Sequence, residues 1–225
     1  GLKFAFSGFG ATLRIGEGTV FEKAMIYLHS DAQVSIGNNC TLFKTQLRLL
    51  NGGEASIGAD CAFREGFIHV NPNARLSIGD RFSVQPRYCM IISEYTNVTI
   101  GRDCMFSWDI LLMAGDSHSI FDVVTKKNIN STIEESKRRK IVIGNHVWLG
   151  ARTIILYHTD IGDGSIIGTG SLVKGKIPNN CVAVGRPAKV VRRNVAWSGE
   201  NAAGDISACG EAYVRMTEDN HLTLL

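Results

Sequence analysis

The chain contains little proline, no long apolar run and little net charge. Proline accounts for 4 of the 225 residues, well below the usual share of about 5%. No run of 18 apolar residues occurs, which excludes a membrane-spanning helix. The net charge of +3 does not by itself indicate a nucleic acid partner, and we expect none. Hydrophobic residues make up 44% of the chain, which excludes a disordered protein.

Two cysteine-based site classes and a secretory leader are also missing. The 6 cysteines never occur at CxxC spacing, so a zinc knuckle or a thioredoxin-like redox pair is not expected. The first residues, from Gly1 to Phe4, lack the apolar segment of a signal peptide. These absences predict free thiols in a cytoplasmic protein.

An internal repeat is the strongest signal that the sequence contains. From residue 143 the chain divides into consecutive groups of six, which read IGNHVW, LGARTI, ILYHTD, IGDGSI, IGTGSL and VKGKIP. Earlier in the chain an Ile-Gly pair recurs at spacings of 21, 21, 21 and 22 residues, at Ile15-Gly16, Ile36-Gly37, Ile57-Gly58, Ile78-Gly79 and Ile100-Gly101. Three groups of six make 18 residues, so a spacing of 21 is one such turn plus a three-residue loop.

This period predicts an all-β solenoid. A six-residue unit that points one large aliphatic and one small residue inward forms one flat side of a prism, and three sides make a coil. Successive coils then stack at strand spacing, about 4.8 Å. A sandwich of short strands does not explain the six-residue register, so we expect a parallel β-helix. Cys40, Cys61 and Cys104 occupy the fifth position of their units and are predicted to point inward as small apolar residues.

The same units resemble the hexapeptide-repeat acyltransferases. The resemblance covers roughly residues 12–193 and is sharpest from IVIGNHVWLGARTIIL to IPNNCVAVGRPAKVVRR, residues 141–193. It is closest to the acetyl-CoA-dependent O-acetyltransferases of sugars and bacterial polysaccharides. It implies a left-handed parallel β-helix, acetyl-CoA as acyl donor, no metal, and a homotrimer with active sites between subunits.

Two segments interrupt this pattern. Residues 116–140 contain no hexapeptide and are strongly polar, and a loop of that length in a compact solenoid is usually functional. Residues 194–225 also lack the repeat. We therefore expect a β-helix domain over 1–193 with a loop excursion at 116–140, followed by a C-terminal extension over 194–225.

His118 stands at the head of the excursion, within Asp116-Ser117-His118-Ser119. A lone histidine is usually structural. This one lies where a solenoid extrudes a polar loop, and its place before the WLG coil matches that of the catalytic histidine in the family. The resemblance implies that His118 is the general base for direct transfer to a hydroxyl. Asp116 is close enough in sequence to orient the ring.

The oxyanion donor and the pocket wall are expected in the WLG coil. In the family, the residue after Val-Trp-Leu-Gly supplies a backbone N–H to the thioester oxyanion, so Ala151 is the candidate. Its small side chain leaves room for the pantetheine arm of CoA. Trp148 is expected to shape the pocket wall, and the alternative is an aromatic side chain that fills a seam between subunits.

The remaining CoA contacts follow from register with sugar acetyltransferases. Thr169 and Lys174 are expected to meet the pantetheine arm and the nucleotide. Lys189 and Arg192, which follow Pro187 in GRPAKVVRR, are expected to meet the phosphates. The alternative for these basic residues is solvated charge on the last coil.

The sequence gives little information about the acceptor of the acetyl group. The resemblance implies a carbohydrate, such as a bacterial surface or capsular polysaccharide or its precursor. The basic residues of the excursion would suit an acidic glycan, although a charge run is more often a solvated face. Arg87, Tyr88 and Tyr95 come from coils beneath the expected site and are candidates to line it.

Three other functions remain open from the sequence. N-acylation of an amino sugar or an antibiotic would use the same histidine and CoA groove. A zinc lyase of the gamma carbonic anhydrase type would use His118, His146 and His158, although the usual pair of histidines five residues apart is missing. A purely structural solenoid would not need the excursion that carries His118.

Overall fold

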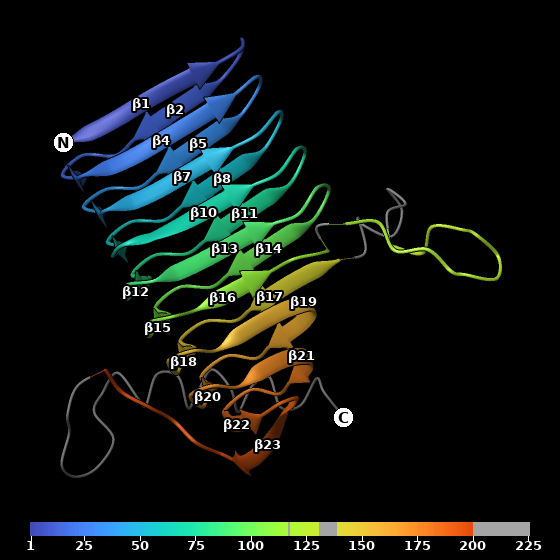
Figure 1. Cartoon of the computed structure of the whole chain (residues 1–225). Helices are drawn as coiled ribbons and strands as arrows, with labels where there is room; N and C mark the ends of the chain where they lie inside the picture. The colour runs from blue at the N-terminus through green and yellow to red at the C-terminus, as the bar shows by residue number, and fades with distance from the viewer. Residues whose placement is uncertain (117, 131–138, 200–225) are drawn as a thin grey trace.

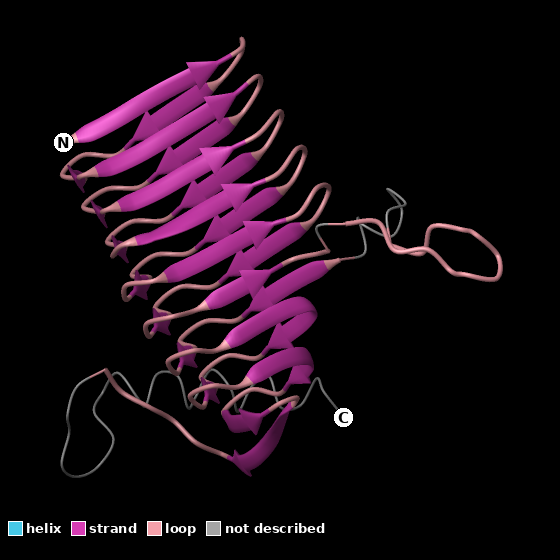
Figure 2. Ribbon diagram, viewed as in Figure 1, coloured by secondary structure: helices cyan, strands magenta, loops and turns pink. Residues whose placement is uncertain are grey.

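The computed structural model describes residues 1–116, 118–130 and 139–199. These residues form strands and turns, and within them no helix is long and apolar enough to cross a membrane. The strands wind into a solenoid whose coils each have three sides (Figures 1 and 2). This arrangement confirms the predicted parallel β-helix, and we call its sides face one, face two and face three in chain order.

On each face, a strand pairs in parallel with the strand one coil later. Face one begins with β1 (Leu2–Ser7), β4 (Ala24–His29), β7 (Thr45–Leu49), β10 (Gly66–Val70), β13 (Tyr88–Ile92) and β16 (Leu111–Met113). Face two begins with β2 (Thr12–Ile15), β5 (Gln33–Ile36), β8 (Glu54–Ile57), β11 (Arg75–Ile78), β14 (Asn97–Ile100) and β17 (Lys140–Ile143).

The third face contains the shortest strands and the end of the solenoid. It comprises β3 (Val20–Glu22), β6 (Thr41–Phe43), β9 (Ala62–Phe63), β12 (Ser83–Val84), β15 (Met105–Phe106), β18 (Trp148–Leu149), β20 (Ile166–Ile167), β22 (Cys181–Gly185) and β23 (Ala188–Arg193). Strand β23 turns back and pairs antiparallel with β22. A hairpin therefore ends the repeat.

The change of period from 21 to 18 residues has a structural cause at the corner between faces one and two. In the early coils a separate turn joins the two faces, such as residues 30–32 between β4 and β5. In the later coils a single strand runs around this corner. Strand β19 (Ile154–Ile161) pairs with β16 on one face and β17 on the other, and β21 (Leu172–Ile177) follows it. The additional residues of the early coils thus form the corner turn.

The interior is a stack of like positions from successive coils. Cys40, Cys61 and Cys104 are at most 1% exposed, which confirms their predicted inward orientation. Phe82 takes the same position in the coil between Cys61 and Cys104, and its buried ring lies 5.2 Å from the Phe63 ring and 4.9 Å from the Phe106 ring, centroid to centroid. Each Cys thiol donates to carbonyl groups of its own and the next coil, so the small position is packed without leaving the polar S–H unpaired.

Strand β1 is the first strand of this stack among the described residues. Phe4 and Phe6 of β1 align with the buried Ile26 and Leu28 of β4, so they occupy inward positions. With no coil above them in the structure, they are 49% and 59% exposed.

Candidate active site

The excursion leaves the solenoid at the corner between faces one and two. It begins after β16 and returns at β17, and Figure 1 shows it projecting sideways from the coils. His118 lies at its start and is exposed. The ring of His118 makes no hydrogen bond to any described residue.

Asp116 supports this segment in a different way from the one expected. Its carboxylate accepts a hydrogen bond from Asn130 Nδ2 (3.1 Å) and lies 3.4 Å from the guanidinium of Arg139. The same Asn130 amide donates to the backbone oxygen of His118 (2.8 Å). Asp116 therefore positions the His118 backbone through Asn130, and within the described chain it does not contact the ring.

Arg139 is buried where the excursion joins the solenoid. Its side chain is 5% exposed, donates to the Asn130 backbone oxygen and lies over the Tyr157 ring, 5.0 Å from its centroid. Gly115 keeps this region compact, because a Cβ there would lie 2.8 Å from the Ser93 side chain and 3.1 Å from an Arg139 nitrogen. Arg139 therefore does not belong to the solvated basic rim that the sequence suggests. Lys137 and Arg138 lie outside the described residues.

Of the expected CoA residues, Ala151 and Thr169 lie at the other edge of face one. Ala151 and Thr169 occupy successive turns at the corner between faces three and one, where Gly170 N donates to Ala151 O (2.8 Å). Arg186 of the next turn donates to Gly170 O (2.7 Å). The Ala151 N–H has no acceptor among the described residues. A stack of small residues with a free backbone donor thus runs along this corner.

Basic side chains lie on the face-three side of this corner. Lys189 and Arg192 of β23 pair with Val184 and Val182 of β22 and are exposed. Lys174 lies instead at the excursion edge of face one, with its Nζ 4.9 Å from the centroid of the Tyr157 ring that Arg139 also covers.

Trp148 lies outward on face three and has a neighbour that the sequence did not reveal. It is aligned with Met105 of β15 and Ile166 of β20 and is 36% exposed. The Trp197 ring lies 6.0 Å from it and stacks on His146 at 4.0 Å, with 8° between the planes. The described start of the C-terminal extension therefore packs beside the candidate pocket wall.

His146 holds this segment in place. Its Nδ1 lies 2.9 Å from Asp103 Oδ2, its Nε2 lies 2.9 Å from Trp197 O, and the Trp197 indole N–H donates to His146 O. A histidine with two such contacts is a structural clamp. No spacing in the sequence links residues 51 positions apart, so only the fold could reveal it.

The three expected acceptor residues are placed differently from one another. Tyr88 is 2% exposed inside the core, its hydroxyl donates to Thr45, and burial raises its pKa. Enclosed in this way, Tyr88 does not contact an acceptor, so this expectation is corrected. Arg87 is exposed and forms a bidentate pair with Asp109, which lowers the pKa of that carboxyl. Tyr95 lies at the excursion's corner, one coil earlier.

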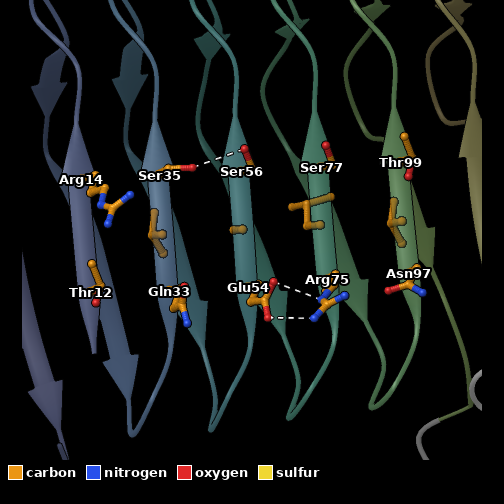
Figure 3. A pocket seen from close by; sticks show the side chains of 14 residues that line it. Thr12, Arg14, Gln33, Ser35, Glu54, Ser56, Arg75, Ser77, Asn97 and Thr99 are labelled. Carbon is orange, nitrogen blue, oxygen red and sulfur yellow. Dashed lines mark hydrogen bonds and ion pairs between the residues drawn. The ribbon is translucent and has the colours of Figure 1, made fainter. Parts of the chain in front are cut away.

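A broad groove elsewhere contains none of the expected site residues. It lies on face two, has a volume of about 510 Å³ and is lined by the outward side chains of β2, β5, β8, β11 and β14 (Figure 3). Arg75 and Glu54 pair across it at 3.0 Å. The charged side chains that line the groove are thus partly paired with one another.

Comparison with known proteins supports the functional reading of this fold. The bacterial transferase hexapeptide (six repeats) profile matches residues 140–175. The chain is 34% identical over 157 residues to the polysialic acid O-acetyltransferase of Escherichia coli O1:K1 / APEC, which covers 68% of this chain and 49% of that protein. It is 30% identical over 170 residues to the putative lipopolysaccharide biosynthesis O-acetyl transferase WbbJ of Escherichia coli (strain K12), covering 74% and 75%.

Solved structures agree with these relatives. The polySia-specific acetyltransferase NeuO superposes with a TM-score of 0.82 at 25% identity, over 100% of this chain and 98% of that one. The polysialic acid O-acetyltransferase OatWY has the same fold, with a TM-score of 0.72 at 22% identity over 93% and 99%. The chain spans about half the length of the first curated relative.

Proposed function

Because the chain belongs to the hexapeptide-repeat family of acyltransferases, we propose that it is an acetyl-CoA-dependent O-acetyltransferase. Its acceptor is a carbohydrate, a bacterial surface or capsular polysaccharide or the precursor of one. The single observation that supports this most is an exposed histidine, with no ring hydrogen bond to the described residues, on an excursion of the solenoid in a chain whose relatives are named as O-acetyltransferases of polysialic acid and lipopolysaccharide.

The reaction is a direct transfer. His118 takes the proton from the acceptor hydroxyl, and the oxygen attacks the thioester carbonyl of acetyl-CoA. The backbone N–H of Ala151 donates to the oxyanion that forms. When the intermediate collapses, the C–S bond breaks and the proton on His118 passes to the sulfur of CoA. The products are an acetyl ester and free CoA.

CoA lies along the corner where Ala151 and Thr169 stack. This corner has small residues for the pantetheine arm, and Lys189 and Arg192 beside it provide charge for the phosphates. Lys174, at the excursion edge of face one, reaches CoA from the neighbouring subunit. Trp148, buttressed by Trp197, forms the neighbouring wall. None of these residues requires a metal ion.

The site is completed by a second subunit of a homotrimer. Within one chain, His118 follows the end of β16 and Ala151 precedes the start of β19, so the two residues lie at opposite edges of face one. A base and an oxyanion donor must be within a few ångströms of the same carbonyl. Pairing the His118 edge of one subunit with the Ala151 edge of the next brings them together.

The outer surface of face one fits such an interface. From β13 onward its outward side chains, apart from the exposed Lys174, are apolar and only half-buried in the single chain, as expected for a surface that a neighbour covers. These side chains are Cys89, Ile91, Leu111, Met113, Ile154, Leu156 and Leu172.

The direct test is acetyl-CoA consumption with a panel of sialylated, neutral and amino-sugar glycans. We expect CoA thiol release with at least one carbohydrate, and an acetyl product that mild alkali removes. An alkali-stable amide would indicate N-acylation instead. Absence of release with every carbohydrate, in a protein that binds acetyl-CoA, would contradict the proposal.

A further inference from the structure

A cavity on the N-terminal half of face one has a composition unlike that of the rest of the face. It is lined by Tyr27, His29, Gln46, Arg48 and Phe67, and its volume is about 370 Å³. The residues come from β4, β7 and β10, which lie side by side in Figure 1.

The cavity is built by two rows of outward side chains. Tyr27, Arg48 and His69 are direct cross-strand partners, and Gln46 and Phe67 are partners in the adjacent row. Parallel strands separated by about 4.8 Å bring such side chains into lateral contact. Phe67 and His69 meet edge to face, with centroids 5.6 Å apart. The rows therefore combine flat apolar surfaces with polar and cationic groups.

The cationic groups of this cluster lack a counter-charge. Among the described residues, no carboxylate lies within ion-pair distance of Arg48, whereas Arg75 and Arg87 on other faces each pair with one. His69 Nε2 is enclosed and has no hydrogen-bond partner in that part of the chain. Burial lowers the pKa of His69, and the charges of Arg48 and His29 lower it further. An anion would remove this imbalance.

We propose that this cluster is a distal acceptor subsite that binds an acidic sugar of the polysaccharide through its carboxylate. The Arg48 guanidinium takes the carboxylate in two parallel hydrogen bonds. Phe67 and Tyr27 pack on the apolar face of the sugar ring, and the Gln46 amide bonds a hydroxyl. This inference rests on the proposed function and adds to it the charge of the acceptor.

The subsite is compatible with the trimer proposed above. Only the apolar rows from β13 onward suit close subunit packing. Over β4, β7 and β10 the neighbouring copies would bring like charges together, which is unfavourable without an intervening anion. This half of face one therefore stays open to a polyanionic chain at the subunit boundary.

The distance to the excursion makes the inference dependent on acceptor length. Arg48 on β7 is three strands from β16, which is about 14 Å along the solenoid at strand spacing. A single sugar is shorter than this separation. Only an oligomer can occupy the subsite and the active site together.

The experiment compares Arg48→Gln with Arg14→Gln, an exposed arginine on face two with no carboxylate partner among the described residues. Acetyl transfer is measured with sialic acid oligomers of increasing length and with glucose oligomers of matched size. Arg48→Gln should raise KM for a hexamer of sialic acid about tenfold, the loss of roughly one charge-assisted contact. The rise should shrink as the acceptor is shortened, and Arg14→Gln should leave KM unchanged.

Direct titration of the sialic acid hexamer into the protein without acetyl-CoA separates the two proposals. Binding that depends on Arg48, with no acetyl transfer to any glycan, would end the proposed function and leave the subsite standing. Transfer with the same KM in Arg48→Gln and Arg14→Gln would overturn the subsite and leave the function standing. Because the Arg48 side chain is exposed, the substitution does not disturb the core, and thermal melting of both variants checks this.

Discussion

The N-terminal and C-terminal halves of the solenoid share a large aliphatic interior and differ in their outer surfaces. Both halves bury Ile, Leu and Val, while the small inward position is Cys in early coils and Thr or Ser, as at Thr153 and Ser171, in later ones. The outward rows of face one change from Tyr27, Arg48 and His69 in the early coils to Ile91, Met113 and Leu156 in the later ones. Stacking of coils fixes the inward residues, so differences in function must be encoded by the outward ones and by the turns.

The two ends of the solenoid also differ from each other. At the N-terminal end, Phe4 and Phe6 are inward residues left exposed, whereas at the C-terminal end β23 folds back on β22 and the segment up to Gly199 packs on His146. The expected catalytic and CoA-binding residues all lie in the C-terminal half. The following predictions test whether chemistry, stability and assembly divide between the halves in this way.

Replacing the proposed base should have the largest effect. His118→Ala should lower kcat by about 10²–10⁴, the usual range for a lost general base, while acetyl-CoA binding and thermal stability persist. His158→Ala, which removes an exposed histidine of the next coil, is the matched control and should retain activity. Loss of activity in both variants, together with zinc in the purified protein, would favour the zinc lyase instead.

Truncating aromatic residues should separate the middle of the stack from its N-terminal end. Phe106→Ala should destabilise the protein by about 3–5 kcal/mol, since the ring is fully buried against Phe82. Phe6→Ala should cost clearly less, because over half of that side chain is already exposed. Denaturant unfolding measures both. Equal losses would mean that the N-terminal end is covered in solution.

A charge placed on the apolar rows should weaken assembly. Met113→Glu should shift the protein from a trimer, three times 24.5 kDa, toward the monomer and reduce activity with it, because an unpaired carboxylate is costly inside an interface. We expect the dissociation constant to rise about 10²-fold, the effect of a few kcal/mol. Ser77→Glu on face two is the control. Light scattering that finds a monomer in the unmodified protein would rule out the trimer.

Removing a cation from the last coil should have the smallest effect. Lys189→Ala and Arg192→Ala should each raise KM for acetyl-CoA about tenfold, with kcat little changed, as for lost uniform binding. The effect should weaken at high salt, which screens exposed charges. Arg14→Gln in the N-terminal half serves as the reference. Unchanged KM in both variants would mean that these residues are solvated charge.

Much of the fold could be predicted because a repeat is local information. The six-residue period specified which side chains point inward, and Cys40, Cys61 and Cys104 lie where it placed them. Tyr88 shows where such reasoning stops. The six-residue count from Ile78 puts Tyr88 at the fifth, inward position, as its burial confirms, but only the fold shows that its hydroxyl bonds Thr45.

The sequence by itself determined the coil, the positions of the excursion and of the candidate base, and the family resemblance, because each depends on residues close together in the chain. The tertiary structure alone decided that Asp116 acts through Asn130, that Arg139 is buried beneath Tyr157, and that Trp197 stacks on His146. The physical reason is that a solenoid brings together side chains one or more whole coils apart, so their contacts depend on how the coils stack.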